Sequence, residues 1–156
     1  MDKAARILIV DDDENIRRVL VAILEDEGYF VESVGTGGSA IEKTKRNFYN
    51  LALIDVRLPD MEGIELLTKL KDTTPKMRKI IITGFPTLQN AVEAVNRGSD
   101  AYILKPFDVN KVLDTIKQQL KEQEKERKYS QERVADFIEA RVKELSVEEA
   151  THKRKP

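Results

Sequence analysis

The chain has 156 residues, of which 40% are hydrophobic, and this suits one globular domain with an appendage. Its 27 basic and 28 acidic residues give a net charge of -1, which provides no general electrostatic reason to expect a nucleic-acid partner. Without cysteine the chain can form neither disulfides nor Cys-ligated zinc sites, and no run approaches the roughly 20 apolar residues of a membrane span. We therefore expect a soluble, cytoplasmic protein without direct contacts to nucleic acid or membrane.

Five short apolar runs, rich in β-branched residues, alternate with segments of helical periodicity. This alternation predicts βαβ units and hence an α/β fold with a parallel sheet. The predicted strands are residues 7–10, 30–34, 51–54, 79–82 and 101–104. The predicted helices are residues 16–24, 39–46, 64–70, 88–95 and 108–120.

Beyond residue 120 the composition changes, because residues 121–156 hold 10 basic and 9 acidic residues. The alternating charges of residues 121–128 predict a solvated continuation of the fifth helix. Apolar residues then return at helical spacing and form one narrow face: Val134, Phe137, Ile138, Val142 and Leu145. This face suits either an output or dimerisation helix or a linker within a longer protein, and both remain open. Residues 148–156 are expected to be a disordered tail, in which the single histidine, His152, is solvated.

Polar residues directly follow four of the five predicted strands. In chain order they are Asp11, Asp12 and Asp13, then Asp55, then Thr83, then Lys105. In open parallel sheets, ligands bind outside the carboxyl ends of the strands. We therefore expect these side chains to converge on one site.

Converging carboxylates repel one another unless a cation neutralises them, and a hard divalent ion such as Mg²⁺ prefers oxygen ligands. An ionised carboxylate beside such a metal can act as a nucleophile toward phosphorus. Lys105 could pair with a phosphate oxygen, and Thr83 offers a hydroxyl donor. Taken singly, an acid after a strand is usually a helix cap, and Asp12 or Asp13 could cap the first helix. The combination favours a metal and phosphate site.

The segments ILIVDDD, LALIDVRLPDMEG, IIITG and AYILKPF, in this order, resemble the receiver domains of two-component response regulators. The resemblance covers about residues 6–120. It implies a flavodoxin-like fold of the chemotaxis-regulator kind, with a five-stranded parallel sheet in the order 2-1-3-4-5 and helices on both faces. It divides the chain into a receiver domain (1–120), a charged helical extension (121–147) and the tail (148–156). Arg57 together with Gly84 and Phe85 is similar to receivers of nitrogen-regulatory regulators.

The resemblance also implies the roles of the candidate residues. Asp55 would accept a phosphoryl group from a sensor histidine kinase or phosphotransfer protein. The implied Mg²⁺ ligands are Asp11 (through water), Asp12, Asp55 and the backbone carbonyl of Arg57. The implied phosphate-binding and switch residues are Thr83, Lys105 and Tyr102, the last being the aromatic residue that turns inward on activation.

The implied function is a phosphoacceptor switch that changes its surface to control a downstream protein or output module. A homodimer through the C-terminal helix is a further predicted interaction. Apart from its own phosphorylation and slow dephosphorylation, we expect no enzymatic activity. One alternative is a phosphorylation-independent interaction module that acts through that helix. Another is a Mg²⁺-dependent phosphatase or phosphotransferase acting on small molecules, but such enzymes generally need a second acid shortly after the nucleophile, where this chain has Arg57. The cognate kinase, the target, and whether the chain is part of a longer regulator are left open.

Overall fold

The computed structural model describes residues 4–153 and divides into two compact units between Gln123 and Glu124. The first unit contains a five-stranded parallel sheet in the order β2-β1-β3-β4-β5, which confirms the predicted fold and strand order. The strands are β1 (Arg6–Val10), β2 (Phe30–Val34), β3 (Leu51–Asp55), β4 (Arg78–Thr83) and β5 (Ala101–Leu104). The helices are α1 (Glu14–Asp26), α2 (Gly37–Arg46), α3 (Gly63–Lys69), α4 (Leu88–Asn96) and α5 (Val109–Lys153).

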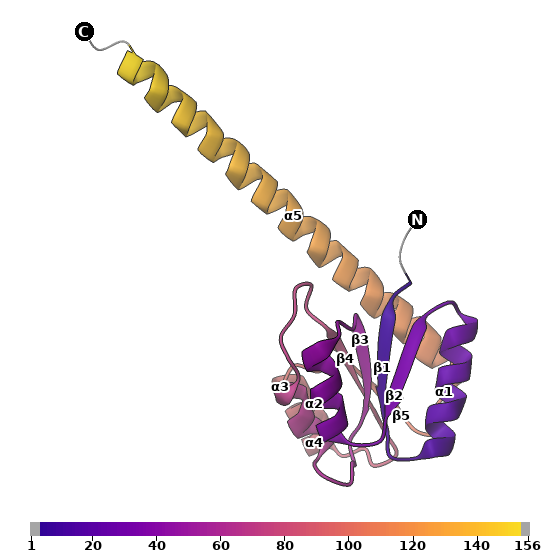
Figure 1. Cartoon of the computed structure of the whole chain (residues 1–156). Helices are drawn as coiled ribbons and strands as arrows, with labels where there is room; N and C mark the ends of the chain where they lie inside the picture. Colours follow the sequence, from indigo (N-terminus) through magenta and orange to yellow (C-terminus); the bar gives the residue numbers. More distant parts are fainter. Residues whose placement is uncertain (1–3, 154–156) are drawn as a thin grey trace. The chain divides into compact units, whose positions relative to one another are not determined.

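Helices cover both faces of the sheet, as Figure 1 shows. Successive residues of a strand point to opposite faces, so β1 contributes to two separate hydrophobic clusters. Ile7 and Ile9 pack with apolar residues of α1 and the first turns of α5. Leu8 and Val10 pack with apolar residues of α2, α3 and α4. Both faces are therefore buried, which explains why the strands read as continuous apolar runs rather than as alternating ones.

The centre of the sheet brings the ends of β1 and β3 together. The two strands are hydrogen-bonded in parallel, with Val10 opposite Ile54. The residues that come next, Asp11 and Asp55, therefore lie at the same level. From β1 the chain moves outward to β2 and then crosses back to β3 on the other side of β1, so this is the point where strand order reverses and where open sheets bind ligands.

The end of the first unit is fixed by the buried side chain of Gln123. Its amide nitrogen donates to the carbonyl oxygens of Asn50 and Lys76, each at 2.8 Å. The Asn50 amide donates back to Gln123 Oε1 at 3.1 Å. Asn50 and Lys76 precede β3 and β4, so α5 is attached at the edge of the sheet opposite to Asp55.

The second unit is the continuation of α5 from Glu124. The helix runs through Lys153, so the disordered tail expected from residue 148 is wrong for residues 148–153. These residues contain neither Gly nor Pro, and charge alone does not interrupt a helix. The side chain of His152 and residues 154–156 lie outside what the structure describes.

The apolar face predicted in the second unit is exposed on the helix. Its members, each 49–71% exposed, are Val134, Phe137, Ile138, Val142 and Leu145. Such a face is large for an isolated helix. Within residues 4–153, no helix has both the length and the apolar character that crossing a membrane would require.

Candidate functional site

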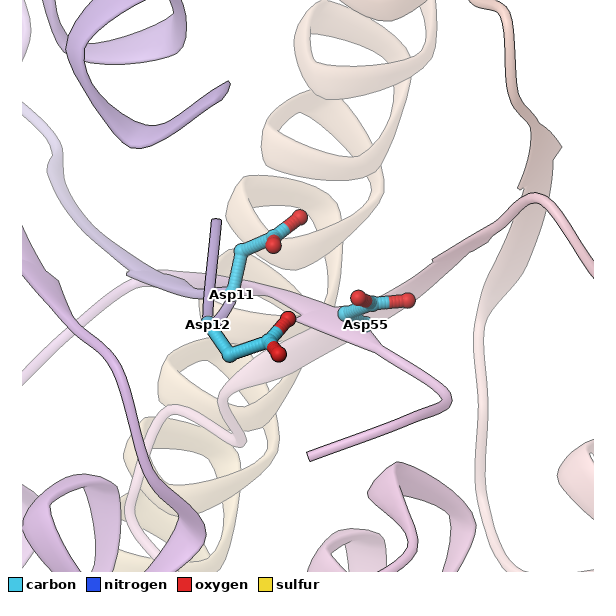
Figure 2. Close-up of side chains that lie close together, drawn as sticks. All are labelled: Asp11, Asp12 and Asp55. Atoms are coloured by element: carbon cyan, nitrogen blue, oxygen red, sulfur yellow. The ribbon is translucent and has the colours of Figure 1, made fainter. Parts of the chain in front are cut away.

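Three carboxylates meet at the carboxyl edge of the sheet, as Figure 2 shows. Asp11 and Asp12 follow β1, and Asp55 is the last residue of β3. One carboxylate oxygen from each lies within 4.8 Å of the others. Asp11 and Asp55 are only 1% and 7% exposed, whereas Asp12 faces solvent. The predicted convergence of these acids is therefore present, with one open side.

Asp13, the third acid after β1, does not belong to this group. Its carboxylate accepts hydrogen bonds from the backbone N–H groups of Asn15 and Ile16, at 2.9 and 3.3 Å, and so caps the N-terminus of α1. The N–H of Asp13 in turn donates to Asp11 Oδ1 at 2.9 Å. The choice that the sequence left open, Asp12 or Asp13, is thus decided: Asp13 is the cap, and Asp12 lies with the other acids.

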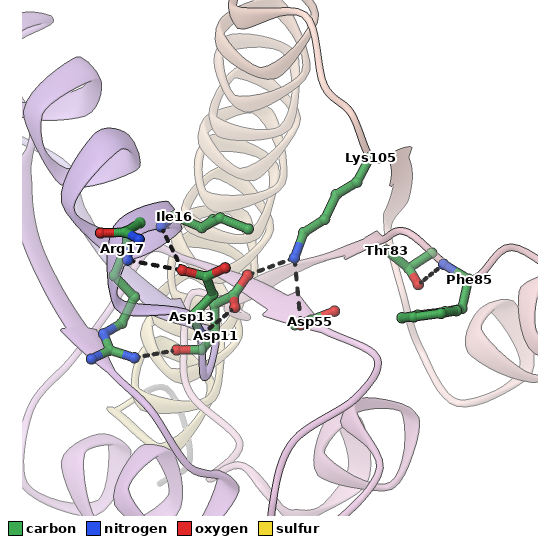
Figure 3. Close-up of polar contacts among 9 residues, drawn as sticks. Asp11, Asp13, Ile16, Arg17, Asp55, Thr83, Phe85 and Lys105 are labelled. Atoms are coloured by element: carbon green, nitrogen blue, oxygen red, sulfur yellow. Dashed lines mark hydrogen bonds and ion pairs between the residues drawn. The ribbon is translucent and has the colours of Figure 1, made fainter.

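Lys105 provides the positive charge at this site, as Figure 3 shows. Its ammonium lies 2.8 Å from Asp11 Oδ2 and 3.4 Å from Asp55 Oδ2. Burial alone would lower the pKa of Lys105, but the hydrogen bond to Asp11 and the charges of Asp11 and Asp55 raise it overall. The side chain is therefore a cation held between two carboxylates, and its predicted pairing with a phosphate oxygen stays a prediction.

The acceptor candidate Asp55 has a perturbed acidity. Burial raises its pKa, and the negative charge of Asp11 adds to this effect. The charge and hydrogen bond of Lys105, together with the backbone N–H of Arg57, act in the opposite direction without cancelling the rise. An acid whose charge is disfavoured in this way gains from a nearby cation, because the cation stabilises the ionised form.

Thr83 ends β4 and is fully buried. Its Oγ accepts a hydrogen bond from the backbone N–H of Phe85 at 2.9 Å (Figure 3). This bond uses the acceptor side of the hydroxyl, and a hydroxyl also carries one donor. Thr83 therefore ties the start of the loop between β4 and α4 to the end of the strand.

Tyr102 lies in β5, and its ring packs against the hydrophobic cluster below α2, α3 and α4. The hydroxyl oxygen is buried and makes no hydrogen bond within the described residues. Burial raises the pKa of this phenol. The ring therefore occupies an inward, half-buried position, in line with its apolar neighbours.

Arg57, two residues after Asp55, lies in the β3–α3 loop (residues 56–62) and has an exposed side chain. Its guanidinium lies 3.7 Å from the centre of the Phe85 ring, which is a cation–π contact. This contact joins the loop after β3 to the loop after β4, and no sequence pattern predicted it. The Arg57 backbone forms an isolated antiparallel bridge with Glu62, so the loop is closed at its base.

Gly63 begins α3 and also allows the chain to pass close to the C-terminal end of β3. Its N–H donates to the Val56 carbonyl at 2.6 Å. A Cβ at this position would overlap the backbone carbonyl oxygen of Asp55. Only a residue without a side chain allows this close approach. The segment LPDMEG shows that a glycine stands at this position, but only the folded backbone explains why a glycine is required there.

The comparisons with known proteins agree with this geometry. Residues 7–117 match the family model of the response regulator receiver domain. The chain belongs to this family. As a receiver domain of two-component systems, it is a signalling module.

Three related proteins illustrate the likeness. A crystal structure of a CheY-like receiver domain from Methanospirillum hungatei is 50% identical and has a TM-score of 0.76, covering 80% of this chain and 99% of that one. The beryllofluoride-activated NtrC4 receiver domain dimer is 37% identical with a TM-score of 0.71, covering 76% and 98%. The transcriptional regulatory protein ZraR of Klebsiella oxytoca is 36% identical over 114 residues, which are 73% of this chain but 26% of ZraR. The chain thus spans about a quarter of the length of ZraR.

The donor set at the site fits a hard divalent cation. All three side chains offer carboxylate oxygens, and the two buried ones, Asp11 and Asp55, share the Lys105 ammonium as an ion-pair partner. Mg²⁺ is usually held by one or two carboxylates together with water and phosphate oxygens, and the exposed Asp12 leaves a side for these ligands. The acidic pocket is therefore able to bind a metal.

Proposed function

We propose that this receiver is switched by phosphorylation of Asp55 in the presence of Mg²⁺, and that a sensor histidine kinase or phosphotransfer protein donates the phosphoryl group. The observation that carries the proposal is the convergence of Asp11, Asp12 and Asp55 within 4.8 Å, with the Lys105 ammonium against two of them. The proposed metal ligands are Asp12 and Asp55 directly, Asp11 through water, and the backbone carbonyl of Arg57. The receiver family to which the chain belongs supports this assignment.

In the proposed reaction, a carboxylate oxygen of Asp55 attacks the phosphorus of the donor. An O–P bond forms while the bond between phosphorus and the donor's leaving atom breaks, and that electron pair leaves with the donor. The metal, when bound, would neutralise negative charge on the acids and on the transferring oxygens. Lys105, already held beside Asp55, would pair with a phosphoryl oxygen, and the Thr83 hydroxyl would donate to another.

The switch would act through the loop that Thr83 begins. If the Thr83 hydroxyl moves toward a phosphoryl group, its bond to the Phe85 N–H is strained or lost, and the loop leading to α4 moves with it. The nearby surface of α4, β5 and the first turn of α5 carries exposed apolar side chains, each 41–83% exposed: Leu88, Val92, Val95, Leu104 and Val109. We propose that this surface, together with the half-buried Tyr102, is what a downstream protein or output module recognises.

The direct test is to incubate the protein with Mg²⁺ and a small phosphodonor and to measure its intact mass. We expect the mass of one phosphoryl group on wild type, and none on Asp55→Asn or without Mg²⁺. Asp114→Asn, at an exposed acid on α5, is the matched control and should gain the group normally. No gain on wild type, or an equal gain on Asp55→Asn, would contradict the proposal. The first outcome would favour an interaction module that works without phosphorylation, and the second would mean that another residue accepts the phosphoryl group.

We also propose that residues 121–147 form a helical extension that pairs with a second copy of the chain. The exposed apolar face of the second unit supports this, as does the description of the NtrC4 receiver as a dimer. Light scattering should give a dimer for wild type and a monomer for Ile138→Glu. Lys143→Glu, on the opposite side of the helix, should remain dimeric. A wild-type monomer at high concentration would rule this pairing out.

The related proteins give only indirect information about whether this chain binds nucleic acid. ZraR is a transcriptional regulatory protein, and the matched segment is about a quarter of its length. The prediction that this chain makes no direct contact with nucleic acid therefore stays a prediction about its receiver and helical extension. Its net charge of -1 supports that prediction.

A further inference from the structure

Asp60 joins the loop after the acceptor strand to a helix that is distant in sequence. It lies at the tip of the β3–α3 loop, where the Leu58 N–H donates to the Met61 carbonyl at 3.3 Å and closes a tight turn. Its two carboxylate oxygens accept hydrogen bonds from the backbone N–H groups of Gly37 and Gly38, at 2.9 and 2.8 Å. These N–H groups are the first two of α2. They have no partner within their own helix, and an anion is favoured at this end of a helix.

The loop and the N-terminus of α2 are closely packed where Asp60 joins them. A Cβ at Gly37 would overlap the side chain of Met61, which follows Asp60 in the loop. The two hydrogen bonds also lower the pKa of Asp60, so its carboxylate is ionised at neutral pH. Because α2 already has its own cap, in which Thr36 Oγ accepts from the Ser39 N–H at 3.1 Å, the helix start does not depend on Asp60 alone. The two hydrogen bonds to Asp60 therefore stabilise the conformation of the loop at least as much as the start of α2.

The same loop carries Arg57. Its base is closed by the bridge between Arg57 and Glu62 and by the Gly63 N–H donating to the Val56 carbonyl. With the base held on β3 and the tip held on α2, the loop is fixed at two points. A change at the tip is therefore transmitted to the peptide units at the base, including the carbonyl of Arg57.

We infer that Asp60 is a positioning residue for the proposed phosphorylation site: by holding the N-terminus of α2, it orients the loop that contains the Arg57 carbonyl, a proposed metal ligand. This inference rests on the proposed Mg²⁺ ligand set. Asp60 itself is exposed and belongs to no acid cluster among the described residues, so its role is to orient a ligand rather than to be one. Residues that orient metal ligands in this way typically change metal affinity by about tenfold or more when removed.

The test compares Mg²⁺ binding, measured by calorimetry on the unphosphorylated protein, in wild type and three variants. Asp60→Ala removes both hydrogen bonds and should weaken Mg²⁺ binding about tenfold. Asp60→Asn removes the charge but keeps one oxygen acceptor, so its affinity should lie close to that of wild type. Thr36→Ala weakens the start of α2 without touching the loop and should lower the melting temperature while leaving Mg²⁺ affinity unchanged.

A second readout separates positioning from general loss of structure. In Asp60→Ala, phosphorylation from a small phosphodonor should need more Mg²⁺ for half-maximal rate but should reach the wild-type rate at saturating Mg²⁺. In wild type, Mg²⁺ should shift the amide resonances of Gly37 and Gly38, and this response should be lost in Asp60→Ala. Unchanged Mg²⁺ affinity in Asp60→Ala overturns the inference while leaving the proposed function standing. Equal weakening in Asp60→Asn and Asp60→Ala also overturns it, in favour of a charge effect. A wild type that binds no Mg²⁺ refutes the proposed function itself.

Discussion

Replacing Lys105 by Met should make the stability of the receiver depend more strongly on Mg²⁺ than that of wild type. Met keeps an unbranched side chain of similar length but removes the ammonium that lies 2.8 Å from Asp11 and 3.4 Å from Asp55. The carboxylates left behind are poorly solvated, with side chains only 2% and 10% exposed. They would face each other, and the nearby Asp12, without a counter-ion.

The magnitude follows from these distances. With an effective dielectric constant of about 20, the two contacts correspond to attractions of about 6 and 5 kcal/mol before desolvation is subtracted. Removing one partner from a buried ion pair is usually found to lower stability by about 3–5 kcal/mol. Because Asp55 already has a raised pKa and can take up a proton, we expect the lower end, about 3 kcal/mol without metal at neutral pH. A ligand at 100 times its dissociation constant adds about 2.7 kcal/mol, so saturating Mg²⁺ should recover most of this loss.

The assay is urea denaturation followed by circular dichroism, at several Mg²⁺ concentrations. The matched control is Lys117→Met, because Lys117 and Glu27 form an ion pair of 3.6 Å whose side chains are 56% and 35% exposed. That variant should lose less than about 1 kcal/mol and show the wild-type response to Mg²⁺. The reasoning is refuted if Lys105→Met is as stable as wild type without metal, or if Mg²⁺ stabilises both equally.

Three further predictions concern stability. Gly63→Ala should lower the free energy of unfolding by about 3 kcal/mol or more, because the new Cβ would overlap backbone atoms at the end of β3; a loss below about 1 kcal/mol by urea denaturation would contradict this. Tyr49→Phe should lose about 2 kcal/mol in the same assay, since the Tyr49 hydroxyl donates to the Glu32 carboxylate at 2.9 Å. Burial, followed by this hydrogen bond, raises the pKa of Tyr49 to about 12. Burial lowers the pKa of Lys79 below its ordinary value of 10.5, so the unfolded chain binds more protons between the two values, and stability should rise with pH in that window. Lys79→Met should lack this rise, and parallel pH profiles for the two proteins would disprove it.

Much of the fold was predictable because parallel strands buried on both faces are short, apolar and separated by helical periodicity. The ends of the helices were harder to predict. For example, α2 begins at Gly37 rather than at residue 39, because its cap is Thr36, with glycines following it. The length of α5 was underestimated because high charge indicates solvent exposure, and a solvated segment without Gly or Pro can still be helical. Composition alone therefore could not locate the end of that helix.

The acids and the lysine of the site were predictable because each follows a strand, and strand ends share one edge. The roles of Asp60 and Gly63 were not, since they depend on how the β3–α3 loop folds back, and no periodicity reports that. The contact between Arg57 and Phe85 joins two loops from different strands and also needs three-dimensional coordinates. Residues that bear chemistry were visible in the sequence, whereas residues that orient them became visible only in the fold.

The hydrogen bonds of Gln123 determine how a structural change at the Asp55 site can be transmitted along α5. From Val109, four residues after Lys105, to Gln123, α5 is a rod about 21 Å long. One end begins shortly after Lys105 of the proposed phosphorylation site, and the other is tethered to the backbone before β3 and β4. A displacement of about 1 Å at the first end, with the tether intact, would turn the axis of this rod by about 3°. The output of the receiver would then be a small rotation about a fixed point, and Gln123→Leu, which removes the tether, should leave Asp55 chemistry intact while releasing that point.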